Sequence, residues 1–129
     1  MDNKKLVLVV DDAPAILRFV RISLSAAGYN VIMAGGGAEA LALVRSEKPD
    51  VIVLDMLMSP MSGFDVLREL RQFPDIPVIA CSANSAAAER SLSEGATDFI
   101  TKPFLPDHLA KKIRQVLESR KSRPEAGTH

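Results

Sequence analysis

Five polar residues lie at the carboxyl ends of short apolar segments, and their types are those that phosphoryl transfer uses. They are Asp11, Asp12, Asp55, Ser82 and Lys102. Three carboxylates brought close together repel one another, and a hard divalent cation relieves that repulsion. A carboxylate in such a site can act as a nucleophile and form an acyl phosphate. A Lys ammonium and a Ser hydroxyl can stabilise the charge on the phosphoryl oxygens.

The apolar segments predict the elements that would bring these five residues together. Most are β-branched and apolar on successive residues, which is typical of strands buried on both faces of a parallel sheet. They are residues 6–10, 31–34, 51–54, 78–81 and 99–100. In an open parallel sheet, ligands bind outside the carboxyl ends of the strands. The sequence therefore predicts that the five polar residues converge at one edge of a sheet.

The segments between the strands have the periodicity of helices. Ile16, Phe19, Val20 and Leu24 share one face, and Gly28 is suited to the C-terminal cap. The other predicted helices cover residues 39–48, 64–70, 86–94 and the segment from Pro106 to Leu117. Strand and helix thus alternate five times, and right-handed crossovers place helices on both faces of the sheet.

Each of the five polar residues also has a plainer interpretation. Aspartates and serines that follow strands often cap the next helix, and a lone lysine is usually a solvated surface charge. Asp55 is harder to explain in this way, because it directly follows a buried strand. The combination of all five is much less expected by chance than any one of them.

Composition sets broader limits. The chain has 129 residues, 47% of them hydrophobic, and a formal net charge of zero. These values indicate one domain and favour neither nucleic acid nor an anionic membrane as a partner. No apolar run approaches the ~20 residues of a transmembrane helix. The single cysteine, Cys81, is expected to be buried, and a cytoplasmic location is expected. We expect the domain to cover residues 1–120 and residues 121–129 to form a flexible tail.

Together these residues resemble the receiver domains of two-component signalling, the CheY-like group. The motifs that carry the resemblance are Val9–Asp12, Leu54–Met58 with Pro60 and Gly63, Ser82-Ala83 and Phe99–Phe104. The likeness runs from about Lys5 to Leu117. It implies a single (βα)5 flavodoxin-like α/β domain with a parallel sheet of strand order 2-1-3-4-5. It also implies a signalling phosphoacceptor rather than an enzyme, with only self-directed phosphotransfer and slow autodephosphorylation.

The resemblance implies a role for each matching residue. Asp55 would accept the phosphoryl group. Asp12 would bind Mg²⁺ (or Mn²⁺) directly, together with Asp55 and the backbone carbonyl of Leu57, and Asp11 would act mainly through a bound water. Lys102 would pair with the phosphoryl group, and the Lys102-Pro103 peptide bond would be cis. Ser82 would be the switch hydroxyl and Phe99 the switch aromatic.

This sequence departs from the family's pattern at four places. Ser59 stands where the family usually has proline, and Pro60 follows it. Phe99 replaces a common tyrosine, so no phenol hydroxyl can take part in the switch. The segment between Ser82 and Gly95 is short, which predicts a shortened or shifted fourth helix. Leu57 is apolar at a position that influences the hydrolytic water.

The implied partners are a sensor histidine kinase or histidine phosphotransfer protein, and a downstream protein on the face of the fourth helix, fifth strand and fifth helix. We expect no direct binding to nucleic acid, no membrane insertion and, because few residues follow Leu117, no output domain there. The main alternative is a pseudo-receiver that binds proteins without phosphorylation. A haloacid-dehalogenase-like phosphatase would need a second aspartate where Leu57 stands, and Gly35–Gly37 lacks the signature of a nucleotide-binding loop.

Overall fold

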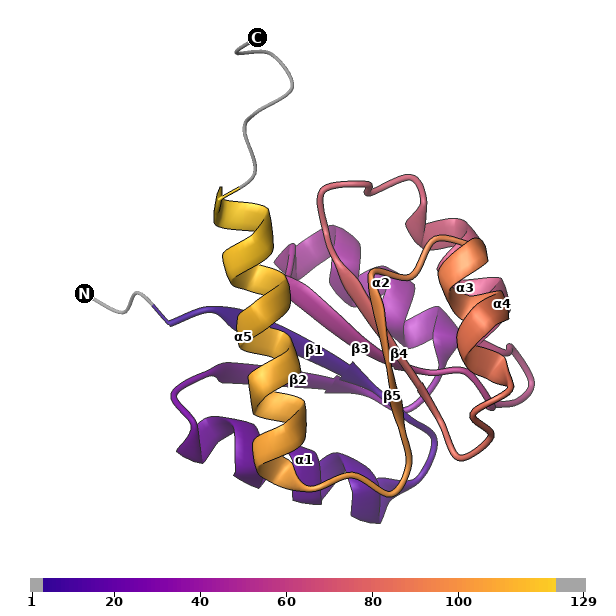
Figure 1. Cartoon of the computed structure of the whole chain (residues 1–129). Helices are drawn as coiled ribbons and strands as arrows, with labels where there is room; N and C mark the ends of the chain where they lie inside the picture. The colour runs from indigo at the N-terminus through magenta and orange to yellow at the C-terminus, as the bar shows by residue number, and fades with distance from the viewer. Residues whose placement is uncertain (1–3, 123–129) are drawn as a thin grey trace, which may run out of the picture.

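Strands and helices alternate through residues 4–122, the part of the chain that the computed structural model describes (Figure 1). The elements are β1 (Leu6–Val10), α1 (Pro14–Ala26), β2 (Asn30–Ala34), α2 (Gly37–Glu47), β3 (Val51–Asp55), α3 (Gly63–Leu70), β4 (Val78–Ser82), α4 (Ala87–Ser93), β5 (Asp98–Thr101) and α5 (Pro106–Ser122). All five predicted strands are present, and the observed strands extend at most one residue beyond either predicted end.

The five strands form one parallel sheet in the order β2-β1-β3-β4-β5, which confirms the predicted fold. Helices α1 and α5 cover one face and α2, α3 and α4 the other (Figure 1). Alternate strand residues enter two separate clusters: Leu8 and Val10 pack toward α2 and α3, whereas Val7 and Val9 pack toward α1 and α5. Both faces need apolar side chains, and this is why the strands are apolar on successive residues.

The residues at the helix ends explain where α1 and α2 begin or end. Pro14 opens α1, where its missing N–H leaves no partner unsatisfied. Gly28 follows α1 with a φ of 101°, and the Tyr29 N–H donates to the carbonyl of Leu24 at 3.0 Å, so the predicted glycine cap is confirmed. Helix α2 ends at Glu47, and its C-cap residue, Lys48, adopts the left-handed conformation with a φ of 47°.

Several helix boundaries differ from the sequence prediction, and α4 is one residue shorter at each end than the predicted range 86–94. Helix α2 begins two residues early, at Gly37, and Glu39 accepts a hydrogen bond from the Gly35 N–H at 2.8 Å. Helix α4 is short, with seven residues, as expected from the spacing between Ser82 and Gly95. Helix α5 continues to Ser122, two residues into the predicted tail. The rest of that tail lies outside the described residues.

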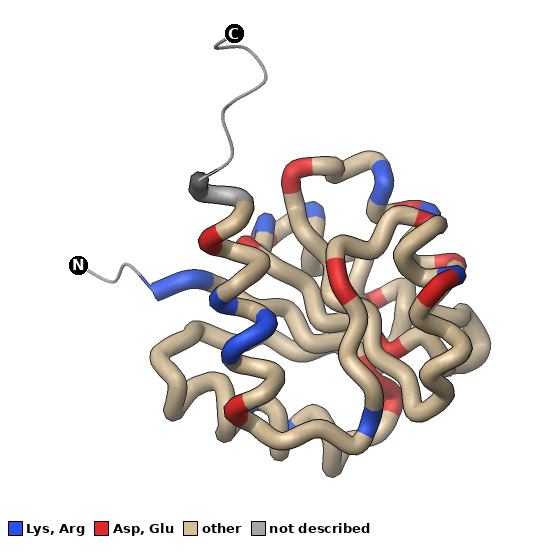
Figure 2. The backbone as a smooth tube through the Cα atoms, in the orientation of Figure 1, with Lys and Arg blue, Asp and Glu red and all other residues tan. Residues whose placement is uncertain are grey.

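Charged residues of both signs are interspersed over the molecule (Figure 2), as the zero net charge suggests. Within residues 4–122, no helix is both long and apolar enough to cross a membrane. Cys81 is buried in β4, as predicted, and burial raises the pKa of its thiol to about 12.

Candidate functional site

Three carboxylates meet at the carboxyl edge of the sheet. Asp11, Asp12 and Asp55 each place an oxygen so that the three atoms lie within 4.8 Å of one another. Asp11 is 2% exposed and Asp55 is 4% exposed, whereas Asp12 faces solvent. Among the described residues this is the one group of acidic, histidine or cysteine side chains with the spacing of a metal site. The predicted convergence is therefore present for the three carboxylates.

Backbone hydrogen bonds place these residues by extending the sheet beyond the strand ends. The Asp11 N–H donates to the carbonyl of Ala34, the last residue of β2, at 3.1 Å. The Met56 N–H, one residue beyond Asp55, donates to the carbonyl of Cys81 at 3.0 Å. On the other side, the Lys102 N–H donates to the carbonyl of Ser82 at 2.9 Å. The positions of the side chains are thus set by main-chain bonds, which side-chain motion does not disturb.

Lys102 completes the charge arrangement. Its Nζ lies 2.6 Å from Oδ2 of Asp11 and 3.4 Å from Oδ2 of Asp55. Burial lowers the pKa of Lys102, but the hydrogen bond to Asp11 and the attraction of both carboxylates more than offset this, and the net pKa is raised. The side chain therefore remains an ammonium at neutral pH.

The pKa of Asp55 is raised above its ordinary value. Removal from water is the largest cause, and the charge of Asp11 adds to it. The Leu57 N–H, which donates to Oδ1 of Asp55 at 3.1 Å, and the Lys102 ammonium act in the opposite direction. Three clustered carboxylates with one internal cation retain an excess of negative charge. Hard oxygen donors with that excess fit Mg²⁺, which binds through one or two carboxylates and keeps several waters.

The hydrogen bonds of Asp11 and Ser82 include local ones that belong to turns. Oδ1 of Asp11 accepts from the Ala13 N–H at 2.9 Å, just before α1, while its other oxygen contacts Lys102. Ser82 is buried at the end of β4, and its hydroxyl accepts from the Asn84 N–H at 3.1 Å rather than capping α4. The plainer interpretation, that Asp11 caps the next helix, is not borne out: the N-cap of α1 is Ala13 and has no side-chain cap, and the Asp11 bond belongs to the turn before it.

Phe99 lies near Ser82 in the register of the sheet. Residue Ala80 of β4 pairs with Phe99 of β5, and Ser82 comes two residues after Ala80. Side chains two residues apart on a strand share a face, so Ser82 and Phe99 both point toward the α2–α3–α4 face. The Phe99 ring is half-buried against the cluster on that face.

The loop after Asp55 contains the shifted proline, Pro60, and ends where α3 begins. Helix α3 begins at Gly63, and both the Ser59-Pro60 and the Lys102-Pro103 peptide bonds are cis. The second was predicted, and the first was not.

Leu57 is 61% exposed, so an apolar side chain stands in solvent two residues after Asp55. Beside Lys102, an apolar groove is lined by Ile16, Phe19, Ala83, Pro103 and Phe104.

The family profile of the response regulator receiver domain matches residues 7–114. The chain belongs to this family. Among curated proteins, the receiver domain is 45% identical over 111 residues to the transcriptional regulatory protein KdpE of Mycobacterium tuberculosis, covering 84% of the chain and 49% of KdpE. It is 42% identical over 117 residues to the probable transcriptional regulator ycf27 of Porphyridium aerugineum, covering 89% and 49%.

A solved structure supports the same conclusion. The CheY-like receiver domain protein of Methanospirillum hungatei JF-1 superposes with a TM-score of 0.87 at 29% identity, covering 92% of this chain and 98% of that one. The receiver domain spans about half the length of the curated relatives that it matches. Phosphorylation on an aspartate and binding of Mg²⁺ at an acidic pocket are general for receiver domains.

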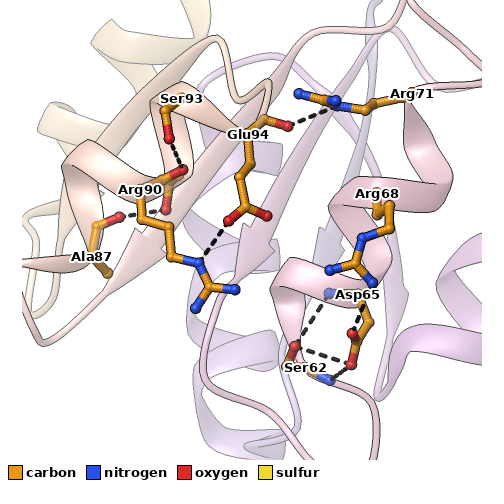
Figure 3. Close-up of polar contacts among 9 residues, drawn as sticks. Ser62, Asp65, Arg68, Arg71, Ala87, Arg90, Ser93 and Glu94 are labelled. Atoms are coloured by element: carbon orange, nitrogen blue, oxygen red, sulfur yellow. Dashed lines mark hydrogen bonds and ion pairs between the residues drawn. The ribbon is translucent and has the colours of Figure 1, made fainter.

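Sequence reasoning did not assign a role to the start of α3. Ser62 and Asp65 form a reciprocal capping box there, with Oγ of Ser62 accepting from the Asp65 N–H and the Asp65 carboxylate accepting from the Ser62 N–H (Figure 3). A serine followed three residues later by an acidic residue was the available signal. The direct contact between Lys102 and Asp11 was also not predicted, because it depends on how two loops pack in space.

Proposed function

We propose that this receiver domain accepts a phosphoryl group on Asp55, with Mg²⁺ or Mn²⁺ bound at Asp12, Asp55 and the carbonyl of Leu57. The observation that carries the proposal is the cluster of three carboxylates, two of them buried, with the Lys102 ammonium in contact with both buried ones. Asp55 is the acceptor because it ends the central strand β3 and lies beside both the metal ligands and Lys102. Asp11 would act mainly through a water bound to the metal.

The donor is the phosphohistidine of a sensor kinase or phosphotransfer protein. A carboxylate oxygen of Asp55 attacks phosphorus, and the new P–O bond forms as the P–N bond to the donor histidine breaks. The imidazole leaves with the electron pair of that bond and takes up a proton. Lys102 and the Ser82 hydroxyl bind phosphoryl oxygens and stabilise the charge that develops on them. The metal, when bound, supplies positive charge to the same oxygens.

The consequence of phosphorylation is a change of protein contacts. The new phosphoryl oxygens draw the Ser82 hydroxyl away from the Asn84 N–H, its partner at 3.1 Å. The ring of Phe99, on the same face two residues along the register, then turns inward. This alters the surface formed by α4, β5 and α5, which is the proposed contact for a downstream protein. An identical Phe99 rotamer in the free and phosphorylated forms would contradict this step.

The deciding experiment follows incorporation of phosphate from acetyl phosphate with Mg²⁺, by intact-protein mass spectrometry. The wild-type protein should gain one phosphoryl group, and addition of EDTA should prevent this. Asp55→Asn should gain none, whereas Asp75→Asn, an exposed aspartate in the α3–β4 loop, should behave like wild type. Labelling of Asp55→Asn would move the acceptor to another residue. No labelling and no binding of beryllofluoride by wild type would favour the pseudo-receiver interpretation instead.

A further inference from the structure

The loop that follows Asp55 is closed at its base by the first residue of α3. The Gly63 N–H donates to the carbonyl of Met56 at 3.1 Å. The N–H of the same Met56 donates to the carbonyl of Cys81 in β4 at 3.0 Å. The Asp55-Met56 segment of main chain is therefore fixed from two sides, by the sheet on one and by α3 on the other.

Gly63 is in such close contact with this segment that no side chain fits there. A Cβ on Gly63 would overlap the carbonyl oxygen of Asp55 and the Cα of Met56 and would lie 3.0 Å from the carbonyl carbon of Asp55. These are backbone atoms of a buried strand end, which have no alternative rotamer. An added methyl group can be accommodated only if α3 and the Asp55-Met56 main chain move apart.

Helix α3 cannot easily make that movement alone. The capping box of Ser62 and Asp65, with bonds of 3.2 Å and 3.1 Å, keeps the first turn of the helix intact, so the helix would have to move as a unit (Figure 3). Its inner face buries Phe64, Val66 and Leu67 in the core cluster. Displacement of the helix would break packing along its length, so part of any strain at Gly63 must pass to Asp55 and Met56.

We infer that Gly63 is a positioning residue for the acceptor, because its bare Cα sets where the main chain of Asp55 and Met56 lies. That main chain determines the positions of two groups of the site, the Asp55 carboxylate and the Leu57 carbonyl. The Leu57 N–H also donates to Oδ1 of Asp55 at 3.1 Å, so a shift of the loop turns the carboxylate as well. The inference rests on the proposed function, in which Asp55 and Leu57 bind the metal.

The test compares Gly63→Ala with Gly37→Ala. Gly37 is also buried and is also the first residue of its helix. A Cβ there would meet side-chain atoms, Sδ of Met61 at 2.6 Å and Cγ2 of Val66 at 2.8 Å, rather than the main chain of the acceptor segment. Both variants should lose stability, but only one pushes on the acceptor. Binding of Mg²⁺ alone is titrated by amide shifts in NMR, and phosphorylation by acetyl phosphate is measured over a range of donor concentrations.

For Gly63→Ala we expect weaker Mg²⁺ binding and a phosphorylation rate at saturating donor that falls about a hundredfold, as expected for a displacement of about 1 Å at a reacting group. Gly37→Ala should retain wild-type Mg²⁺ affinity and rate at temperatures where it is folded. Equal losses in the two variants, or none in Gly63→Ala, would overturn the inference while wild-type activity leaves the proposed function intact. A wild-type protein that neither binds Mg²⁺ nor is phosphorylated would overturn both.

A second measurement decides the matter if Gly63→Ala does not fold. In the wild-type protein, hydrogen exchange of the Gly63 amide should be about as slow as that of Met56, because both bonds hold the same segment. Gly35, whose N–H bonds an exposed Glu39 side chain, is the fast-exchanging reference. A Gly63 amide that exchanges as fast as that of Gly35 would show that the base of the loop opens freely, and the inference would fail.

Discussion

The acidic edge (Asp11, Asp12, Asp55 and Lys102) and the α3–α4 contact (Phe64, Arg71, Arg90 and Glu94) are held in place in different ways. At the acidic edge, main-chain bonds continue the sheet, and both Asp11 and Asp55 are buried. At the α3–α4 contact, exposed arginines make the bonds: Nε of Arg71 donates to the Glu94 carbonyl at 2.9 Å, and Arg90 pairs with the Glu94 carboxylate at 2.7 Å (Figure 3).

Arg90 also lies over the ring of Phe64, with its guanidinium carbon 3.8 Å from the ring centroid. Contacts of this kind at a surface contribute about 0.5–1 kcal/mol each. The two regions therefore differ in how firmly they are held, because the residues that must hold reacting atoms are positioned by main-chain hydrogen bonds. Helix α4, which is part of the proposed output face, is joined to α3 by weak side-chain contacts at the surface.

Among the variants that compare these two regions, the largest effect is expected from Lys102→Met, which removes the cation of the acidic edge. Phosphorylation from acetyl phosphate should fall about a hundredfold, because a donor to the phosphoryl oxygens is lost. In the absence of metal, Asp11 and Asp55 also lose their partner, so the thermal midpoint should drop. Added Mg²⁺ should then raise the midpoint more than in wild type, because the variant pocket is more negative.

Lys111→Met is the matched control, since Lys111 is an exposed lysine on α5. It should leave the phosphorylation rate and the Mg²⁺-induced shift unchanged. A wild-type rate in Lys102→Met would remove Lys102 from the reaction and reduce it to a structural partner of Asp11. A smaller Mg²⁺ shift in that variant would contradict the charge argument for the acidic edge.

The acidic edge was predictable from sequence because the carboxyl ends of the parallel strands decide it. Asp11 and Asp55 follow runs of buried residues, and parallel strands bring their carboxyl ends to one edge. The order 2-1-3-4-5 required the family resemblance, since periodicity does not distinguish which strands are neighbours.

The α3–α4 contact was not predictable in the same way. Arg71 and Glu94 are 23 residues apart, and nothing in their spacing distinguishes them from other surface charges. The fit of Gly63 against the Asp55 main chain is likewise a matter of tertiary distance, which a one-dimensional pattern does not contain. The start of α2 was placed at Glu39 from the helical periodicity, whereas the helix begins at Gly37, because a small residue is tolerated in a first helical turn.

A smaller effect is expected at the border of the acidic edge, from Leu57→Asn. The Leu57 side chain is 61% exposed, yet its main chain bonds Asp55. We expect the leucine to keep water away from the acyl phosphate and so to slow hydrolysis. An amide that holds one water by a hydrogen bond of about 1 kcal/mol would speed dephosphorylation about fivefold. Loss of the phosphoryl group after removal of donor, followed by mass spectrometry, measures this.

Leu92→Asn replaces another exposed leucine, on α4, and controls for a general change of surface polarity. Its dephosphorylation rate should equal that of wild type. If Leu57→Asn also hydrolyses at the wild-type rate, the side chain at this position does not control access of water.

The smallest effect on the chemistry is expected from Arg71→Gln, which tests whether the α3–α4 contact is independent of the acidic edge. Loss of the bond to the Glu94 carbonyl should lower stability by about 1 kcal/mol. Hydrogen exchange should become faster at the Ala96 amide, which closes the end of α4 on the Ser91 carbonyl at 2.9 Å. Phosphorylation should stay at the wild-type rate, because no main-chain bond of Asp55 depends on Arg71.

Arg68→Gln, the neighbouring arginine on α3, is the control for Arg71→Gln. Its ion pair with Asp65 is long, at 3.5 Å, and exposed, so its removal should change neither stability nor exchange in α4. If Arg71→Gln slowed phosphorylation while Arg68→Gln did not, the two regions would be coupled through α3, and the contact at Gly63 would be the connection. If the phosphorylation rate is unchanged in both variants, the α3–α4 contact does not affect the reaction, and α4 responds only to the movement of Ser82.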